Sequence, residues 1–200
     1  MIWFLLIAFV LGELFYKLGI RGELTRKIVH VLCGLVVVLL PLVWNLPHTL
    51  FVGLLFTVIL VWSEKKKLLK SVNAINRPTI GGSLFALGLS VSAAISWSNP
   101  LAFQVSALIL TISDTAAWLA GRGYLGVQKP KNYLVSGIFG LSALCVLILI
   151  GSIAGFLTWN YLLGCLISVV ILSAVEFNSP LGSDNFFVPV VAAILGLIIF

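Results

Sequence analysis

Asp114 is a carboxylate inside an apolar stretch, and such a residue invites a chemical explanation. It lies in Ile-Ser-Asp-Thr-Ala-Ala-Trp-Leu-Ala-Gly-Arg, near the end of an apolar run. A charge in such a run is costly and tends to serve a function. Helical spacing places Asp114, Trp118 and the Gly121–Arg122 pair on one side of a helix. The carboxylate could bind Mg²⁺ while the small residues let a phosphate chain approach; a structural ion pair is the alternative.

A second polar segment begins the second apolar run, with the sequence Glu-Leu-Thr-Arg-Lys-Ile-Val-His from Glu23 to His30. Arg26 and His30 are four residues apart, so they share a helix face. His30 is a candidate base or, alternatively, a hydrogen-bonding partner between helices.

A third polar segment lies near the end of the chain, between Glu176 and Pro189. Its Glu176, Asp184, Asn178 and Asn185 offer the oxygen ligands that hard cations prefer. A loop that only caps two helices would have a similar composition.

Two weaker signals accompany these segments. The sequence from Arg77 to Ser83 contains two adjacent glycines at an expected helix start, where backbone amides could meet a phosphate. Glu13 and Lys17 are four residues apart and predict a structural ion pair within the first apolar run.

The composition predicts that a membrane surrounds these segments. Of 200 residues, 61% are hydrophobic and 9% are charged, whereas soluble domains carry about 25% charged residues. The net charge of +6 does not indicate nucleic-acid binding, because the apolar runs leave no basic face. We therefore expect residues 1–200 to form a single all-α integral membrane domain.

Apolar runs predict a polytopic bundle of transmembrane helices. We expect about seven or eight spans, because a span needs about 20 residues and the third, seventh and eighth runs are short. The runs are Ile2–Leu18, Ile28–Trp44, Thr49–Trp62, Thr79–Trp97, Leu101–Ala120, Leu134–Leu157, Tyr161–Val175 and Phe186–Phe200.

The charges predict the topology of this bundle. If the runs alternate in direction, all 12 Lys and Arg residues fall on one side, whereas the loops at 45–48, 98–100 and 158–160 contain no Lys, Arg, Asp or Glu. The positive-inside rule makes the charged side cytoplasmic and places both termini on the opposite side. The basic cluster Lys65–Lys70 is interpreted as a loop beside lipid head groups.

The three cysteines, Cys33, Cys145 and Cys165, all lie in apolar runs and show no metal-binding spacing. We expect them to be free and packed. Together, the three polar segments predict a site at the cytoplasmic face for a phosphate or metal–nucleotide and a lipid head group.

These segments resemble the motifs of the polyprenol kinase family, which includes phytol kinase, dolichol kinase and CTP-dependent diacylglycerol kinases. Glu23–His30 with Gly34 resembles its Glu-Leu-x-Arg-Lys-x-x-His-x-x-x-Gly motif. Ser113–Ala117 with Gly121–Arg122 resembles its nucleotide segment. Glu176–Pro189 resembles its closing Glu-x-x-Ser-Pro-x-Gly-x-Asp-Asn motif, and the segment from Arg77 is a looser match.

The resemblance implies a kinase that transfers phosphate from CTP, or another nucleotide, to the hydroxyl of a long-chain lipid alcohol, with Mg²⁺ as cofactor. The catalytic residues would be Asp114, His30 and Asp184. The nucleotide- or phosphate-binding residues would be Lys27, Arg122, Lys129, Lys131, Gly121 and Asn185. The metal ligands would be Asp114, Glu176 and Asp184, and the same site would be lined by Glu23, Arg26 and Arg77.

The chain departs from the family pattern after the Gly-Arg segment. Asn132 stands where the family has a hydroxyl residue, and Val135 stands where it has a glycine. Two alternatives remain open: a cytidylyltransferase that forms a CDP-lipid, and a non-catalytic membrane carrier or assembly subunit. A carrier would hold its ionisable groups near the midplane, whereas an enzyme would hold Asp114 at a pocket near one face.

Overall fold

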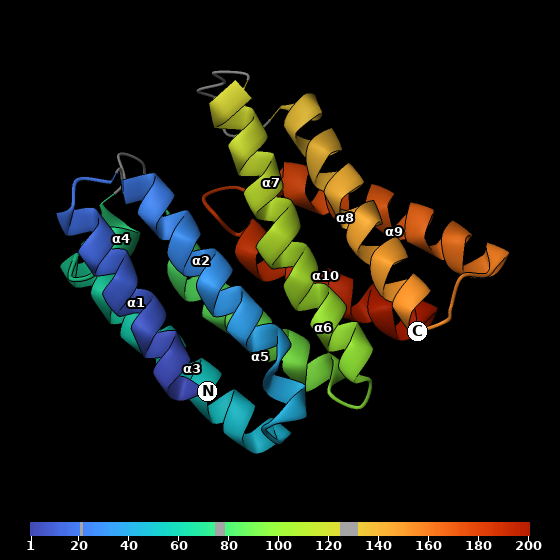
Figure 1. The fold of residues 1–200 in the computed structure, drawn as a ribbon, viewed down its shortest axis with the longest axis horizontal. Helices are drawn as coiled ribbons and strands as arrows, with labels where there is room; N and C mark the ends of the chain where they lie inside the picture. The colour runs from blue at the N-terminus through green and yellow to red at the C-terminus, as the bar shows by residue number, and fades with distance from the viewer. Residues whose placement is uncertain (21, 75–78, 125–131) are drawn as a thin grey trace.

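The protein is a bundle of helices (Figure 1). The computed structural model describes residues 1–20, 22–74, 79–124 and 132–200, and within these ranges it contains no β-strand. The all-α prediction is therefore confirmed. The helices are α1 Ile2–Lys17, α2 Gly22–Val38, α3 Leu46–Lys66, α4 Lys70–Asn73, α5 Gly81–Ser96, α6 Pro100–Leu108, α7 Asp114–Leu119, α8 Tyr133–Ile153, α9 Trp159–Asn178 and α10 Asp184–Ile199, with a short 3₁₀ turn η1 at Leu40–Leu42.

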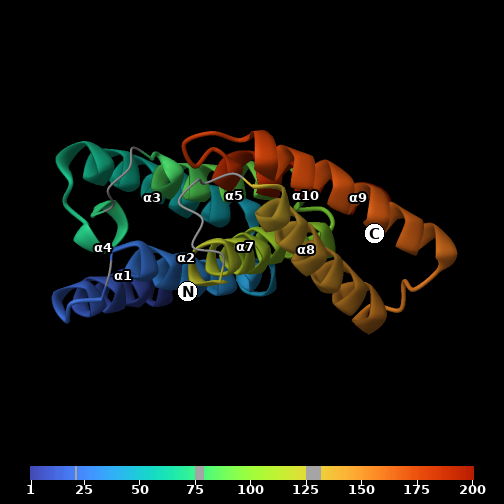
Figure 2. The same cartoon turned by 90° about the horizontal axis from the view of Figure 1, so that it is seen from above.

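The N-terminal half of the bundle forms two layers. Figure 2 shows α1 and α2 in one layer and α3 and α5 in the other, with α4 between the layers at one end. Helix α1 packs on α2, α3 packs on α5, and α10 packs on α5, α6 and α9. The layered arrangement leaves an internal space between the two helix pairs.

Five helical segments are long and apolar enough to cross a membrane: Gly22–Leu42, Leu46–Lys66, Pro100–Arg122, Tyr133–Ile153 and Trp159–Asn178. Two shorter apolar helices, Gly81–Ser96 and Asp184–Ile199, accompany them. The third and seventh apolar runs are short, but the helices that contain them are long enough to cross a membrane. Helices α3 and α9 have 21 and 20 residues, because each continues past its apolar run into polar residues.

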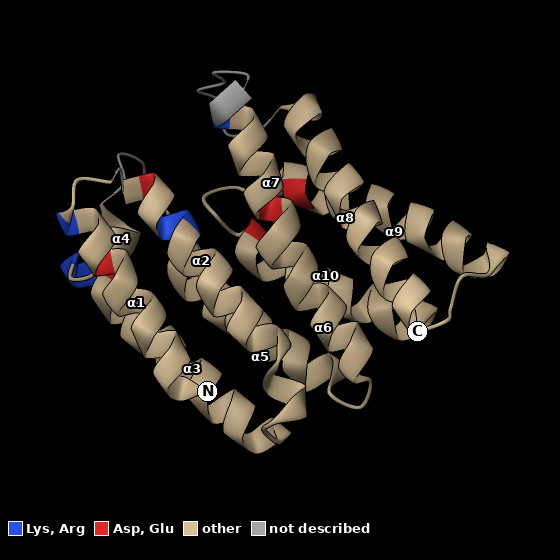
Figure 3. Cartoon of the chain, viewed as in Figure 1, with Lys and Arg blue, Asp and Glu red and all other residues tan. Residues whose placement is uncertain are grey.

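The described charged residues gather toward one end of the bundle. In Figure 3 the coloured Lys, Arg, Asp and Glu residues lie in the upper part of the view, toward the end of the bundle where α1 ends and α2 begins. Both chain ends lie in the lower half. This segregation agrees with the charge distribution expected from the sequence.

In the charge-free loops, neutral side chains cap the helices that begin there. The side chains of Asn45, Asn99 and Thr158 each accept a hydrogen bond from a backbone N–H in the first turn of α3, α6 and α9. Pro100 follows Asn99 directly and begins α6, and Pro47 lies in the first turn of α3, positions at which the missing N–H of proline costs nothing. These caps satisfy the helix starts without any charge.

The helix that carries Asp114 is irregular on both sides of it. A π-helical turn, η2, spans Ile109–Ser113 and joins α6 to α7, and a second one, η3, spans Ala120–Tyr124. π-Helical turns are rare and occur frequently at functional sites. Asp114 is thus the first residue after an irregular turn.

Two cysteines are packed as expected, and one is not. Cys33 and Cys165 are buried, whereas Cys145 is exposed on the outside of α8. The expected ion pair between Glu13 and Lys17 is absent from the described residues. Glu13 Oε1 instead accepts hydrogen bonds from the amide and the hydroxyl of Ser71, at 2.8 and 2.7 Å.

Helix α2 approaches the irregular turn η2 closely at Gly34. A Cβ atom at this position would lie 1.9 Å from Thr111 Oγ1, so only glycine fits without a shift of the backbone. Thr111 is fully buried and donates a hydrogen bond to the carbonyl of Ala107 at 2.7 Å. The contact therefore cannot relax by a simple rotation of the threonine.

Gly34→Ala should lower the free energy of unfolding by about 1–3 kcal/mol, because it overpacks this contact. Gly137 is the matched control, since it is a helical glycine with no atom within 4 Å of its would-be Cβ. Gly137→Ala should be stabilising by about 0.5–1 kcal/mol through helix propensity. Thermal unfolding of the purified variants in detergent measures both changes. Equal behaviour of the two variants would contradict the close approach.

Candidate functional site

An ion pair between α2 and α7 forms the centre of the site. Lys27 Nζ lies 2.5 Å from Asp114 Oδ2 and 3.4 Å from the backbone carbonyl of Asp114. The side chains are only 12% and 17% exposed. In such surroundings each charge depends strongly on the other, since an isolated buried charge is very costly. The pair fixes α2 against the start of α7.

His30 lies one turn along α2 from Lys27 and joins the same group. Its Nε2 is 3.5 Å from Asp114 Oδ2 and 3.2 Å from the carbonyl of Leu110. A carbonyl only accepts, so this contact assigns the proton of the neutral ring to Nε2 and leaves Nδ1 as an acceptor. Phe85 of α5 packs against the ring, with the centroids 4.6 Å apart.

Arg26 and Asn185 meet at the start of α5. A Cβ atom on Gly81 would lie 2.7 Å from the Arg26 guanidinium and 2.6 Å from Asn185 Nδ2, so both side chains lie against this glycine. Asn185 Nδ2 donates to the carbonyl of Gly81 at 3.0 Å. Arg26 also reaches Thr79 Oγ1 at 3.5 Å. The polar start of α5 thereby joins the cluster on α2.

The loop before α10 also lies against the start of α5, next to Thr79 and Gly81. Gly182 has a φ of +87°, and a Cβ atom there would lie 2.6 Å from Thr79 Oγ1. Only glycine combines this backbone conformation with so close a contact. Asp184, the first residue of α10, interacts electrostatically with Lys27. Segments that are far apart in the sequence thus lie together at the start of α5.

A second ion pair lies at the outer edge of the site. Arg122 in η3 pairs with Glu23 in the first turn of α2, and the Arg122 side chain is 47% exposed. Gly121 beside it is buried, and its would-be Cβ lies 3.1 Å from Val135. Val135 therefore packs on Gly121. Asn132 caps α8 by accepting a hydrogen bond from the amide of Leu134 at 2.9 Å.

Glu176 has a different environment from the other site carboxylates. It is buried and accepts a hydrogen bond of 2.5 Å from Ser136 Oγ, which joins α9 to α8. Among the described residues, no three His, Cys, Asp or Glu side chains are grouped to hold a metal ion. The metal set of Asp114, Glu176 and Asp184 therefore stays a prediction. Three further predicted residues, Arg77, Lys129 and Lys131, lie outside the described residues.

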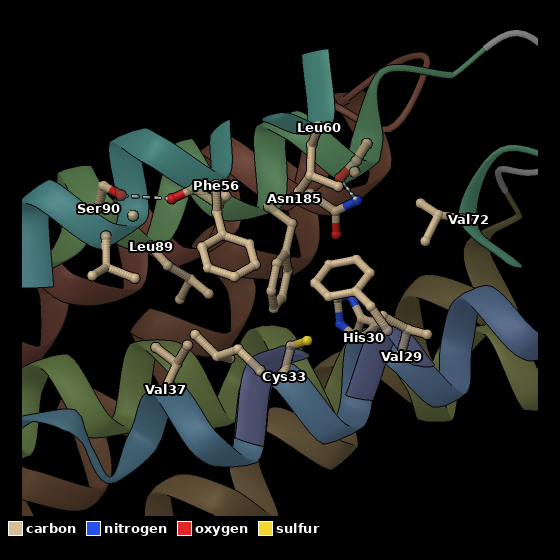
Figure 4. A pocket seen from close by; sticks show the side chains of 18 of the residues that line it. Val29, His30, Cys33, Val37, Phe56, Leu60, Val72, Leu89, Ser90 and Asn185 are labelled. Carbon is tan, nitrogen blue, oxygen red and sulfur yellow. Dashed lines mark hydrogen bonds between the residues drawn. The ribbon is translucent and has the colours of Figure 1, made fainter. Parts of the chain in front are cut away.

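An apolar cavity extends from this polar group into the bundle. Arg26, His30, Asn185 and Gly81 line one end, and mainly apolar side chains, most of them from α1, α2, α3 and α5, line the rest. The cavity has a volume of about 850 Å³, and this value includes the part that is open to the surroundings. Figure 4 shows Val29, Cys33 and Val37 of α2 on one side of it and Phe56, Leu60 and Leu89 on the other. Its lining is apolar along most of its length, with charged and amide groups at one end and the hydroxyl residues Thr49 and Ser90 toward the other.

Comparisons of the chain with protein-family models, curated proteins and solved structures gave no match. The resemblance to polyprenol kinases therefore stays a prediction.

Sequence reasoning did not identify the cavity lining of α3 and α5. These residues are apolar, so no charge or motif marks them. The signal present in the sequence is the repeat of cavity-lining positions at helical spacing, as in Val52, Phe56 and Leu60. The same spacing is expected of any packed helix, so it does not distinguish a cavity from a core.

The mutual dependence of Lys27 and Asp114 can be measured by a double-mutant cycle. Lys27→Met and Asp114→Leu should each lower the free energy of unfolding by about 3 kcal/mol, because each leaves a buried charge without its partner. The double variant should lose clearly less than the sum of the two. Thermal or denaturant unfolding in detergent checks the cycle. Simple additivity would mean that the two side chains do not interact.

Proposed function

We propose that this protein is a lipid-alcohol kinase, which transfers the terminal phosphoryl group of a nucleotide such as CTP to the hydroxyl of a long-chain lipid. The observation that carries the proposal is the position of the Lys27–Asp114–His30 cluster beside the polar end of an apolar cavity. A lipid alcohol fits this arrangement, with its hydroxyl at the charged end and its apolar tail along the apolar side chains. His30 belongs to both features, because it contacts Asp114 and lines the cavity.

His30 is suited to accept the proton of the alcohol. Its Nε2 faces Leu110 and Asp114, which leaves Nδ1 as the acceptor on a ring that lines the cavity. In the proposed step the alcohol oxygen bonds to the γ-phosphorus and the bond from that phosphorus to the bridging oxygen breaks. The nucleoside diphosphate leaves, and the hydroxyl proton passes to His30 or, as an alternative, to Asp184.

The cations of the site would stabilise the transferred phosphoryl group. Phosphoryl transfer depends mostly on positioning and charge neutralisation. Lys27 and Arg26 lie at the polar cluster, and Arg122 lies at its edge, half exposed. Mg²⁺ is usually held by one or two carboxylates together with substrate phosphates. Asp114 and Asp184 fit this requirement, and the ion would neutralise charge on the phosphates.

The side of the membrane follows from the same proposal. The described Lys and Arg residues gather at the end of the bundle that holds the site (Figure 3). We assign this end to the cytoplasm, where nucleotides are available, and both termini to the opposite side. The seven or eight spans expected from the sequence belong to this proposal, with α1, α5 and α10 added to the five longer segments.

A cytidylyltransferase that forms a CDP-lipid is the second candidate. The same charged cluster and cavity would serve it, since it also joins a nucleotide to a lipid. Its products differ, because the nucleotide loses pyrophosphate rather than a single phosphoryl group. A membrane carrier fits less well, because the described ionisable residues gather toward one end of the bundle rather than at its middle.

Asp114→Asn should abolish phosphoryl transfer, with a loss of at least about 10³-fold, because charge stabilisation is central to this chemistry. The carboxamide keeps the size of Asp114 and can still accept a hydrogen bond from Lys27, so it should destabilise the protein less than Asp114→Leu does. The measurement follows label from the γ-phosphate of CTP, and separately of ATP, into a panel of lipid alcohols in liposomes. Intact turnover in Asp114→Asn would exclude its proposed role.

The position of the label distinguishes the candidate functions. Label from the γ-phosphate appearing in the lipid supports the kinase. Release of pyrophosphate, with label from the α-phosphate entering the lipid, would assign the cytidylyltransferase instead. Nucleotide binding that is absent under all conditions would reject both enzymes and favour the carrier.

The exposed lysines at the end of α3 should matter little for turnover. Lys65 and Lys66 lie outside the cluster and are exposed. The double substitution of Lys65→Gln and Lys66→Gln should change the transfer rate by less than about threefold, since exposed charges contribute little. The same γ-phosphate assay measures it, with liposomes of neutral and anionic lipid compared. A collapse of activity in neutral liposomes would place these lysines in the site.

A further inference from the structure

We propose that the cavity between the α1–α2 and α3–α5 layers binds the tail of one lipid alcohol, and that the side-chain oxygen of Asn185 accepts a hydrogen bond from its hydroxyl. This inference rests on the proposed function and adds to it the position of the substrate. It also names a residue that orients the hydroxyl and a physical limit on tail length.

The polar end of the cavity contains an acceptor without a donor. Asn185 is 3% exposed, and its Oδ1 has no hydrogen-bond partner among the described residues. The orientation of the carboxamide is fixed, because only its nitrogen can donate to the carbonyl of Gly81. Figure 4 shows the nitrogen toward this bond and the oxygen directed into the cavity.

A buried acceptor of this kind selects the chemistry of its partner. Leaving it unpaired is costly, so a ligand that donates a hydrogen bond there gains affinity. Phosphate oxygens are themselves acceptors and cannot satisfy Asn185 Oδ1, whereas a hydroxyl can. The structure thus assigns Asn185 to the alcohol rather than to the nucleotide phosphates. His30 lines the same end, so the hydroxyl would lie between an acceptor and the candidate base.

The length of the cavity matches one leaflet of a membrane. Its lining extends from Arg26 to Val37 on α2, from Leu60 back to Thr49 on α3, and from Gly81 to Ser90 on α5. At 1.5 Å per residue these stretches measure about 14–17 Å. Half of a bilayer's hydrocarbon core is also about 15 Å thick. A tail of this length fills the cavity, and a longer tail must leave it.

The far end of the cavity consists of closely packed side chains. Leu40 and Phe103 line it and are 4% and 0% exposed. Val52 of α3 lies near this end, so a larger side chain there should shorten the space. Val58 on the same helix is 66% exposed and does not line the cavity, which makes it a matched control.

The experiment is photo-crosslinking in liposomes, without nucleotide. The probe is a straight-chain alcohol about 15 Å long, the thickness of one leaflet, with a diazirine near its tail end. Labelling should map by mass spectrometry to α2, α3 and α5. It should fall about tenfold in Val52→Phe and stay unchanged in Val58→Phe, with circular dichroism confirming that both are folded. Equal labelling in both variants, or label confined to outward faces, would overturn the cavity assignment.

Competition tests the role of Asn185. The unlabelled alcohol should displace the probe about tenfold better than its methyl ether, which cannot donate a hydrogen bond. Asn185→Ala should remove this preference, whereas Asn185→Asp, which keeps an acceptor oxygen, should retain it. Equal competition by alcohol and ether in the unaltered protein would overturn the hydroxyl contact.

These results are independent of catalysis. Cavity labelling without any phosphoryl transfer would reject the kinase and keep the binding site. Transfer with labelling elsewhere would keep the kinase and overturn the cavity proposal.

Discussion

The contact between Lys27 and Asp114 is the interaction on which the rest of the site depends. Both charges are largely removed from water, so neither is stable there without the other. The pair requires α2 to lie close to the helix that carries Asp114, and Gly34 provides that approach by leaving room for Thr111. His30 is then held between Asp114 and Leu110. The close approach of α2 and η2 is therefore a requirement of the charge pair as well as a packing detail.

The carboxylates of the protein have two kinds of environment. Glu13, Glu64 and Glu176 each accept a hydrogen bond from the hydroxyl of a serine in the first turn of a neighbouring helix: Ser71 in α4, Ser83 in α5 and Ser136 in α8. Glu13 and Glu64 also accept a bond from the serine's backbone N–H, which satisfies a helix start. Asp114, by contrast, contacts two basic side chains of α2. Glu176 thus bonds to a neutral hydroxyl, whereas Asp114 lies beside the charged Lys27.

Much of the fold and part of the site could be predicted from the sequence. All eight apolar runs contain helix, because hydrophobic length is a strong signal, and Asp114, Lys27 and His30 do meet. The partners of Glu13 and Glu176 could not be predicted, because they depend on how distant helices pack. The direction of the Asn185 carboxamide depends on a hydrogen bond to Gly81, 104 residues away in the chain. Cavities arise from the spacing of whole layers, which no local pattern encodes.

The π-helical turn η2 has a consequence for how this helix responds to changes in length. In a regular helix each added residue rotates all later positions by about 100° around the axis, whereas a π turn accommodates one extra residue without that rotation. The direction in which Asp114 points thus depends on the number of residues before it, and not only on their identities. Deletion of a single residue between Ile109 and Ser113 would change η2 into a regular turn, whereas a deletion in the regular helix before it would turn the carboxylate away from α2 while leaving every site side chain present. The site is therefore sensitive to the number of residues in this helix as well as to their identities.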